Sequence, residues 1–184
     1  MARHKLNVGS GRPEPQCRTR DWVNMDLFRN KRLDVQADMF QMPFKNDTFE
    51  EARLIHTLEH LPRDKSLPVL REIRRVLRPG GRAFIEVPDI PTTVRLMNDA
   101  YKGNDRNAVL DLMISLYGKS NIPGMAHLIG FDEVSLTWLM GSGRGPIGDH
   151  PAIEGAGFSK VERSHVMISS HYKYTPVLLM IGTK

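Results

Sequence analysis

Short apolar runs separated by polar segments fill the first half of the chain, and runs of this length predict buried strands. Two of these runs end at candidate ligand-binding residues, Gly9 and Asp26. The last two runs, joined by a short polar turn, predict an antiparallel hairpin. The predicted strands are Lys5–Val8, Trp22–Asp26, 33–37, 52–56, 82–87, 159–168 and 174–181.

Helical periodicity is clearest over 63–81. Asp64 or Ser66 is expected to cap this helix, and Pro68 to lie in its first turn. Pro79-Gly80-Gly81 is expected to end it. Its apolar stripe consists of Leu67, Leu70, Ile73 and Leu77.

Between the fifth strand and the final hairpin the pattern is again helical. It predicts two short helices over 91–117, broken near Gly103, and another over 131–140 that Asp132 caps. The segment 141–151 contains too much glycine and proline for regular structure.

The linkers between the first three strands are unusual for an α/β protein. The first, 11–21, contains Pro13 and Pro15, and the second, 28–32, has only five residues. A parallel crossover normally takes a dozen or more residues, often including a helix. We therefore expect a mostly parallel α/β sheet with reduced helices between its first three strands.

The composition is that of an ordinary single domain over 1–184, with 40% hydrophobic and 26% charged residues. No apolar run reaches the roughly 18 residues of a membrane helix, and the first strand begins too early for a signal peptide. Cys17 is the only cysteine, which excludes an internal disulfide and fits a reducing cytoplasm. The net charge of +5 comes from scattered residues, so it indicates solubility as readily as an anionic partner.

Gly9 and Gly11 follow the first strand, at the sheet edge where α/β proteins bind their ligands. Asp26 ends the second strand, where a carboxylate holds a ribose hydroxyl pair. Together they predict a nucleotide-like ligand. A nicotinamide dinucleotide is one alternative, although the G-x-G-x-x-G pattern is incomplete and prolines follow the turn.

Six segments follow one another in a recognisable order: KLNVGSG, VNMDL, DVQADMFQMPFKNDTFE, HTLEHL, LREIRRVLRPGGRAFIEVPD and EGAGFSKVE. This set resembles the class I S-adenosylmethionine (SAM)-dependent methyltransferases, in particular the group called type 11. The resemblance is dense over 5–89 and returns at 155–162 and in the final hairpin. It implies a Rossmann-like sheet of seven strands, with SAM lying across the carboxyl ends of the first four.

The resemblance also implies roles for single residues. Gly9 and Gly11 would pass under the methionine part of SAM, Asp26 would hold the ribose, and Asp38 would face the adenine. The implied cofactor-binding set is Asn7, Gly9, Gly11, Asp26, Leu27, Asp38, Met39 and His56.

Two positions depart from the family pattern. Asn7 replaces the usual acidic residue before the glycines, and Pro13 replaces a common third glycine. The first change removes a carboxylate that attracts the amino group of SAM, so we expect modest affinity. A SAM-binding protein without catalytic activity is therefore an alternative.

Methyl transfer to a hydroxyl or amine requires loss of a proton, so a nearby base is expected. The candidate catalytic residues are His56, Asp89 and His127. Nucleic-acid acceptors are disfavoured because Ile55-His56-Thr57-Leu58 stands where the (Asp/Asn)-Pro-Pro-(Tyr/Phe) motif of base amine methylation would be. A small molecule, a sugar or a glycan-linked group is the expected acceptor.

The residues His56, Glu59 and His60 also spell H-x-x-E-H, the inverted zincin motif of zinc hydrolases. That chemistry needs both histidines on one helix face. Here His56 is expected to end a strand, and Pro62 follows too closely for a helix interior. We therefore expect no metal ligand, and a zinc hydrolase is the weaker alternative.

The chain before the first strand is too short for the N-terminal lid that many relatives place over SAM. We expect 90–151 to cover the reacting methyl group instead, because the site must exclude water. In this hypothesis His127 and Arg144 face the acceptor. The alternative is a surface that joins two copies in a homodimer.

Overall fold

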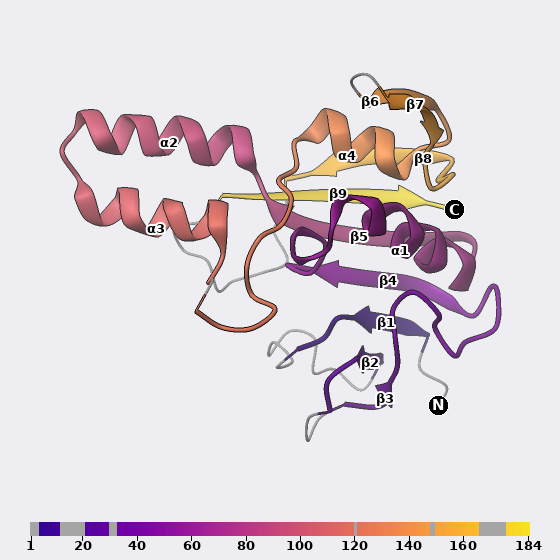
Figure 1. Ribbon diagram of the computed structural model, residues 1–184. Coiled ribbons are helices and arrows are strands. Elements are labelled where there is room, and N and C mark those ends of the chain that lie inside the picture. Colours follow the sequence, from indigo (N-terminus) through magenta and orange to yellow (C-terminus); the bar gives the residue numbers. More distant parts are fainter. Residues whose placement is uncertain (1–3, 12–20, 30–32, 120, 148–149, 166–175) are drawn as a thin grey trace.

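The computed structural model describes residues 4–11, 21–29, 33–119, 121–147, 150–165 and 176–184 (Figure 1). Its strands are β1 (Lys5–Val8), β2 (Trp22–Asp26), β3 (Val35–Gln36), β4 (Phe49–Ile55), β5 (Leu77–Pro88), β6 (Arg144–Ile147), β7 (His150–Glu154), β8 (Lys160–Ser164) and β9 (Val177–Thr183). The helices are α1 (Arg63–Val76), α2 (Ile90–Lys102), α3 (Arg106–Tyr117) and α4 (Glu133–Met140), with a short 3₁₀ helix over Leu58–His60.

Seven strands form one sheet in the order β3-β2-β1-β4-β5-β9-β8. The first five are mutually parallel, whereas β9 runs antiparallel to both β5 and β8. This confirms the predicted Rossmann-like α/β fold with its antiparallel C-terminal hairpin. The ends of the two predicted hairpin strands that adjoin the turn, 166–168 and 174–175, lie outside the described residues.

The register brings the ends of three strands to one edge. Val8, the last residue of β1, lies opposite Met25 of β2 and Leu54 of β4. The chain therefore leaves these strands at the same level, which places Gly9, Asp26 and His56 along one edge of the sheet.

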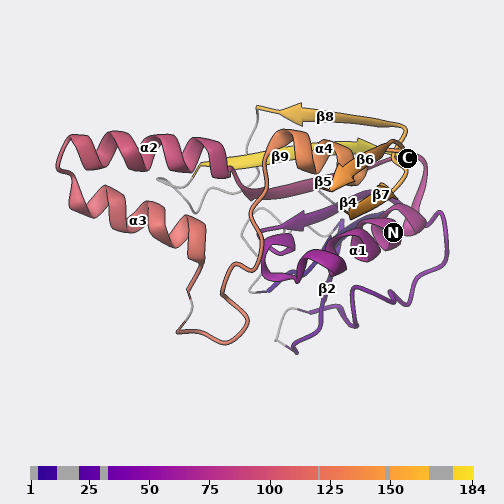
Figure 2. The ribbon, with the colours of Figure 1, turned by 45° about the horizontal axis from the view of Figure 1, so that its top comes forward.

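Helices α1 and α4 cover the same face of this sheet (Figures 1 and 2). The core under them contains alternate strand residues such as Leu6, Val8 and Leu54 together with Ile73 and Leu136. On the opposite face the Arg53 guanidinium stacks over the Trp22 ring, 4.0 Å from its centroid. Within the described residues, no helix covers that opposite face.

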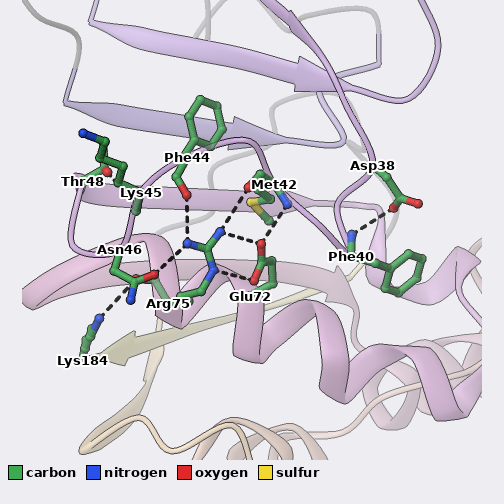
Figure 3. Close-up of polar contacts among 10 residues, drawn as sticks. All are labelled: Asp38, Phe40, Met42, Phe44, Lys45, Asn46, Thr48, Glu72, Arg75 and Lys184. Carbon is green, nitrogen blue, oxygen red and sulfur yellow. Dashed lines mark hydrogen bonds and ion pairs between the residues drawn. The ribbon is translucent and has the colours of Figure 1, made fainter.

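The predicted reduction of helices between the first three strands concerns mostly 12–20 and 30–32, which lie outside the described residues. The described part of 9–34 contains no helix, and β3 has only two residues. The extended crossover from β3 to β4 is held by Arg75 of α1, which donates to the carbonyl oxygens of Phe44 at 2.8 Å and Met42 at 3.1 Å (Figure 3). Glu72 accepts from Met42 N at 2.8 Å and pairs with Arg75 at 2.6 Å. Helix α1 thus supplies the anchor that a crossover helix would otherwise provide.

The start of α1 differs from the prediction. The helix begins at Arg63 after Pro62, without a side-chain cap, and the Ser66 side chain is buried. Pro68 therefore lies inside the helix and not in its first turn. The backbone of Pro62 already has a φ of −55°, so it can start the helix where no polar cap is present.

The segment 141–151 was expected to be irregular, and this expectation was wrong. It contributes β6 and part of β7, which form a separate two-stranded antiparallel sheet. The pairing shifts register between Gly145 and Ile147, so Pro146 falls at a bulge. Proline is tolerated in strands at such irregular positions, which is why composition alone misled.

Helices α2 and α3 form a hairpin that projects beyond the carboxyl ends of the parallel strands (Figures 1 and 2). The chain reverses at Gly103 and Asn104, as predicted, and Asp105 caps α3 by accepting from Ala108 N at 3.0 Å. Asp132 caps α4, also as predicted.

In the described part of the chain, every helix is too short or too polar to span a membrane.

Candidate active site

The turn after β1 packs against the turn after β4. Gly9 has a φ of +63° and Gly11 a φ of +50°, values that glycine adopts without strain. A Cβ on Gly9 would lie 2.7 Å from both Cγ2 and Oγ1 of Thr57. A Cβ on Gly11 would meet no atom of the described residues within 4 Å, so the need for glycine there comes from its positive φ.

Asp26, at the end of β2, turns its carboxylate toward this glycine turn. Oδ2 accepts a hydrogen bond from Gly11 N at 2.7 Å, and Oδ1 accepts one from Phe28 N at 2.9 Å. Each carboxylate oxygen can accept more than one hydrogen bond, so both retain capacity for ligand hydroxyls. The tertiary structure thus joins two residues that were predicted separately, Gly11 and Asp26.

Three more predicted cofactor residues lie beside Asp26. Ala37 N donates to the Asp26 carbonyl at 3.0 Å, which places the turn at Asp38 next to the end of β2. Asp38 is exposed, and its Oδ1 accepts the backbone N–H two residues on at 2.9 Å. Met39 packs partly against the core, whereas Leu27 is 51% exposed. This edge therefore offers a carboxylate and apolar surface side by side.

His56 follows β4 and stands between two buried carboxylates. Its Nδ1 lies 3.2 Å from Glu59 Oε1, and its Nε2 lies 3.4 Å from Glu86 Oε1. Burial disfavours the charged ring, but the hydrogen bonds and the attraction of Glu59 and Glu86 outweigh it and raise the pKa of His56 to about 9. At neutral pH His56 is therefore an imidazolium.

A cleft of about 60 Å³ opens beside His56, between the end of β4 and α3. His60 and His127 meet there edge to face, with ring centroids 4.9 Å apart. Burial lowers the pKa of His127 and outweighs the attraction of Glu59, so this ring is neutral at pH 7. The cleft is lined by His56, Glu59, His60, Pro88, Ile114, Ser115, Gly118, Lys119, Met125 and His127.

Comparisons with known proteins identify the family. Residues 16–85 match the methyltransferase domain. Methyltransferase GfsG of Streptomyces halstedii is 30% identical over 138 residues, which are 74% of this chain and 44% of that protein. A SAM-dependent methyltransferase of Archaeoglobus fulgidus has the same fold, with a TM-score of 0.63 at 14% identity, over 100% of this chain and 86% of that one. The chain belongs to the class I SAM-dependent methyltransferases.

Other relatives of this chain are also longer. The ubiquinone/menaquinone biosynthesis C-methyltransferase UbiE of Desulfotalea psychrophila is 29% identical over 116 residues, which cover 62% of this chain and 41% of that protein. The chain spans less than two thirds of the length of the curated relatives it matches. The family uses SAM as its methyl donor.

Asn7 is buried within the sheet. Its Nδ2 donates to Asn24 Oδ1 at 3.0 Å, and Asn24 N in turn donates to Asp34 Oδ2 at 2.9 Å. The amide that replaces the usual acidic residue is thus part of a polar chain across β1 and β2. Pro13, the second departure, lies outside the described residues.

Asp89 occupies the N-cap of α2. Its carboxylate accepts from Thr92 N at 3.2 Å and Thr92 Oγ1 at 3.0 Å, and it pairs with Arg163 at 3.1 Å. These partners give Asp89 a structural role, and the adjacent Pro88 lines the cleft in its place. The side chain of Arg144 lies outside the described part of the structure.

Sequence reasoning missed Glu86 and Thr57. Glu86 is completely buried in β5 and holds one side of His56. The sequence could have indicated this role of Glu86, because a carboxylate inside the apolar run Ala83–Pro88 requires a buried partner. Thr57 carries no such signal, since its role depends on packing against Gly9.

Proposed function

We propose that this domain binds SAM along the edge formed by Gly9, Gly11 and Asp26 and methylates an acceptor held in the cleft. The observation that carries the proposal is that the ends of β1, β2 and β4 converge beside a cleft lined by histidines. When bound, SAM supplies a methyl group on a sulfonium, which a nucleophile can take by in-line displacement. The residues of this chain bind, orient and shield the reactants.

The cofactor edge has the donor and acceptor pattern that this assignment needs. A Cβ at Gly9 would collide with Thr57, so the backbone there is kept bare, while a Cβ at Gly11 would meet no described residue within 4 Å. In the proposal, Asp26 receives the ribose hydroxyls, and Asp38, Met39 and Leu27 receive the adenine. Asn7 acts indirectly, by fixing β1 against β2.

The three candidate catalytic residues take different roles in this proposal. His56 is charged and holds Glu59 in place, so it acts as a positioning residue. His127 is neutral and directs Nδ1 to the Ser115 carbonyl at 2.9 Å, which leaves a lone pair on Nε2 of a ring that lines the cleft. Asp89 positions the start of α2 and the adjacent Pro88.

The acceptor is proposed to be a small molecule, a sugar or a glycan-linked group that is methylated on oxygen or nitrogen. The relatives support a small acceptor, since they include a sterol methyltransferase and ubiquinone/menaquinone methyltransferases. The cleft presents imidazole, carboxylate and the Lys119 side chain, groups that suit a polar acceptor. A nucleic acid is disfavoured because the motif of base amine methylation is missing after β4.

We also propose that α2, α3 and the loop up to Gly130 cover the acceptor. Leu110, Met113 and Ile114 of α3 are 60%, 42% and 46% exposed, although they are apolar. Helix α4 belongs to the core instead, because Leu136 is fully buried there. A homodimer that covers the same apolar surface is the alternative.

The proposed compartment is a reducing cytoplasm, which fits the single cysteine.

Calorimetric titration with S-adenosylhomocysteine (SAH), followed by transfer from labelled SAM to a panel of hydroxyl and amine acceptors, tests the proposal. Binding together with transfer would support it. Binding without transfer to any acceptor would favour the non-catalytic alternative, and absence of binding would overturn the cofactor assignment.

A further inference from the structure

We propose that Glu59, His60 and His127 form a binding site for a divalent transition-metal ion of the Zn²⁺ type. One ligand atom from each residue lies within 4.8 Å of the other two. Donors of a tetrahedral zinc shell, with bonds of about 2.0–2.1 Å, are about 3.4 Å apart, so small side-chain rotations complete it. Two imidazoles and one carboxylate suit a transition metal better than Mg²⁺ or Ca²⁺, which prefer oxygen ligands.

Backbone carbonyls fix both histidines in the tautomer that a metal requires. His60 Nδ1 donates to the Ala126 carbonyl, and His127 Nδ1 donates to the Ser115 carbonyl, each at 2.9 Å. Because a carbonyl only accepts, the proton is on Nδ1 in each ring, and the neutral form of such a ring has its lone pair on Nε2. Metal-binding histidines use the same outer contact to orient the ring.

Glu59 supplies the charge. Its side chain is only 1% exposed, and Oε1 is held by His56 Nδ1 at 3.2 Å. Oε2 is buried and has no hydrogen-bond partner among the described residues. Such an oxygen is costly to bury unless a cation or a donor satisfies it. A metal ion between the two Nε2 atoms and Oε2 removes this cost.

The fold holds His127 at this place. Leu128 N and Ile129 N both donate to the Glu59 carbonyl, at 2.7 and 3.3 Å, which ties the loop after α3 to the end of β4 (Figure 1). His127 N donates to the Tyr117 carbonyl at 3.0 Å. Backbone hydrogen bonds therefore join the segment at Glu59 to the segment at His127, which lies 68 residues later in the chain.

This site is not the inverted zincin arrangement. In that arrangement His56 and His60 would be ligands, but both ring nitrogens of His56 face carboxylates, Glu59 and Glu86. His56 instead orients Glu59 from outside the ligand shell. The proposal replaces the expectation that the chain holds no metal ligand, since His127 provides the third ligand that the motif lacked.

Three protein ligands leave a coordination position open for water or for an acceptor oxygen. A coordinated hydroxyl has a lowered pKa and loses its proton to water more readily. Its oxygen would then bond to the methyl carbon while the carbon–sulfur bond breaks and leaves its electron pair on sulfur. This role rests on the proposed function, but binding of the ion does not.

The test is a Zn²⁺ titration of the chelator-treated chain over residues 1–184, with metal content measured after dialysis. His127→Asn and His60→Asn each remove Nε2 but keep a donor in place of Nδ1, so the backbone contact survives. We expect one equivalent of zinc in the wild type and at least about 100-fold weaker binding in both variants, more than a lost outer contact costs. His165→Asn, a change at an exposed histidine, should bind as the wild type does.

Several outcomes would overturn the site. These are no zinc binding by the wild type, unchanged binding by a folded His127→Asn variant, or a loss caused by His56→Asn and not by His127→Asn. Circular dichroism and melting temperature establish folding, and Co²⁺ absorption bands that disappear in His127→Asn give an independent readout. SAH titration of the metal-free chain separates the two proposals. A chain that binds SAH but fails to bind zinc refutes only the metal site. A chain that binds zinc but fails to bind SAH refutes only the cofactor assignment.

Discussion

Gly9 and Thr57 lie so close that any side chain on Gly9 would overlap the threonine. An added Cβ would be 2.7 Å from two Thr57 atoms, at a φ of +63°. We expect Gly9→Ala to lower the free energy of unfolding by about 2–5 kcal/mol, since backbone strain and overpacking add. Denaturant unfolding measures this loss, and SAH affinity should fall with it.

Gly11→Ala is the matched control for this prediction. Gly11 also has a positive φ, but an added Cβ would meet no described residue within 4 Å. The control should cost about 1–2 kcal/mol, from backbone strain alone. In the double variant Gly9→Ala/Thr57→Ala part of the loss should be recovered. Equal costs for the two glycines would show that the contact with Thr57 is unimportant.

Asp26→Asn should weaken SAH binding about 10- to 150-fold. The physical reason is the loss of a charge-assisted hydrogen bond, worth about 1.5–3 kcal/mol. Asp64→Asn, on a side chain that is 73% exposed on α1, should leave the affinity unchanged. Calorimetry measures both, with melting curves to verify folding. Full affinity in Asp26→Asn would refute the ribose assignment.

Arg75→Met should lower the free energy of unfolding by about 1–3 kcal/mol, because Glu72 and the carbonyls of Met42 and Phe44 lose their donor. Arg78→Met is the control. Arg78 pairs with Glu50 on the surface, where an ion pair contributes about 0–1 kcal/mol. Denaturant unfolding of both variants compares them, and a larger loss in Arg78→Met would contradict the anchoring role of Arg75.

Stability should also depend on pH through Glu72. The hydrogen bond from Arg75 lowers the pKa of Glu72 below 4.5 despite partial burial. A folded-state pKa below the unfolded one stabilises the protein above the unfolded value, and this contribution disappears as pH falls through the folded value. The difference in unfolding free energy between wild type and Glu72→Gln should therefore shrink below about pH 4.5. A difference that is constant in acid would rule out this linkage.

Hydrogen exchange with and without SAH tests the cover over the acceptor. Peptides from α2, α3 and the loop up to Gly130 should exchange more slowly with SAH, because a bound ligand suppresses local opening. Peptides from the middle of α1 serve as the control and should change little. Unchanged protection throughout 90–130 would leave the homodimer surface as the better explanation.

The sequence by itself determined the fold class and the residues at the sheet edge. Apolar runs predicted the strands, and glycine and aspartate at the ends of β1 and β2 indicated the ligand side, because these properties depend on neighbours in sequence. The break at Gly103 and the cap at Asp132 could be predicted for the same reason, because each depends on residues nearby in the sequence. The prediction of irregular structure over 141–151 was wrong because backbone pairing between strands overrides composition.

The tertiary structure alone decided how the candidate residues combine. His127 reaches Glu59 and His60 only because the loop after α3 returns to the end of β4. Asp89 was predicted as a candidate catalytic residue, yet it forms an ion pair with Arg163, which is distant in sequence. The protonation of His56 likewise depends on Glu86 from the neighbouring strand. Burial, charge and distance between segments far apart in the chain arise only when the sheet forms, so no local pattern contains them.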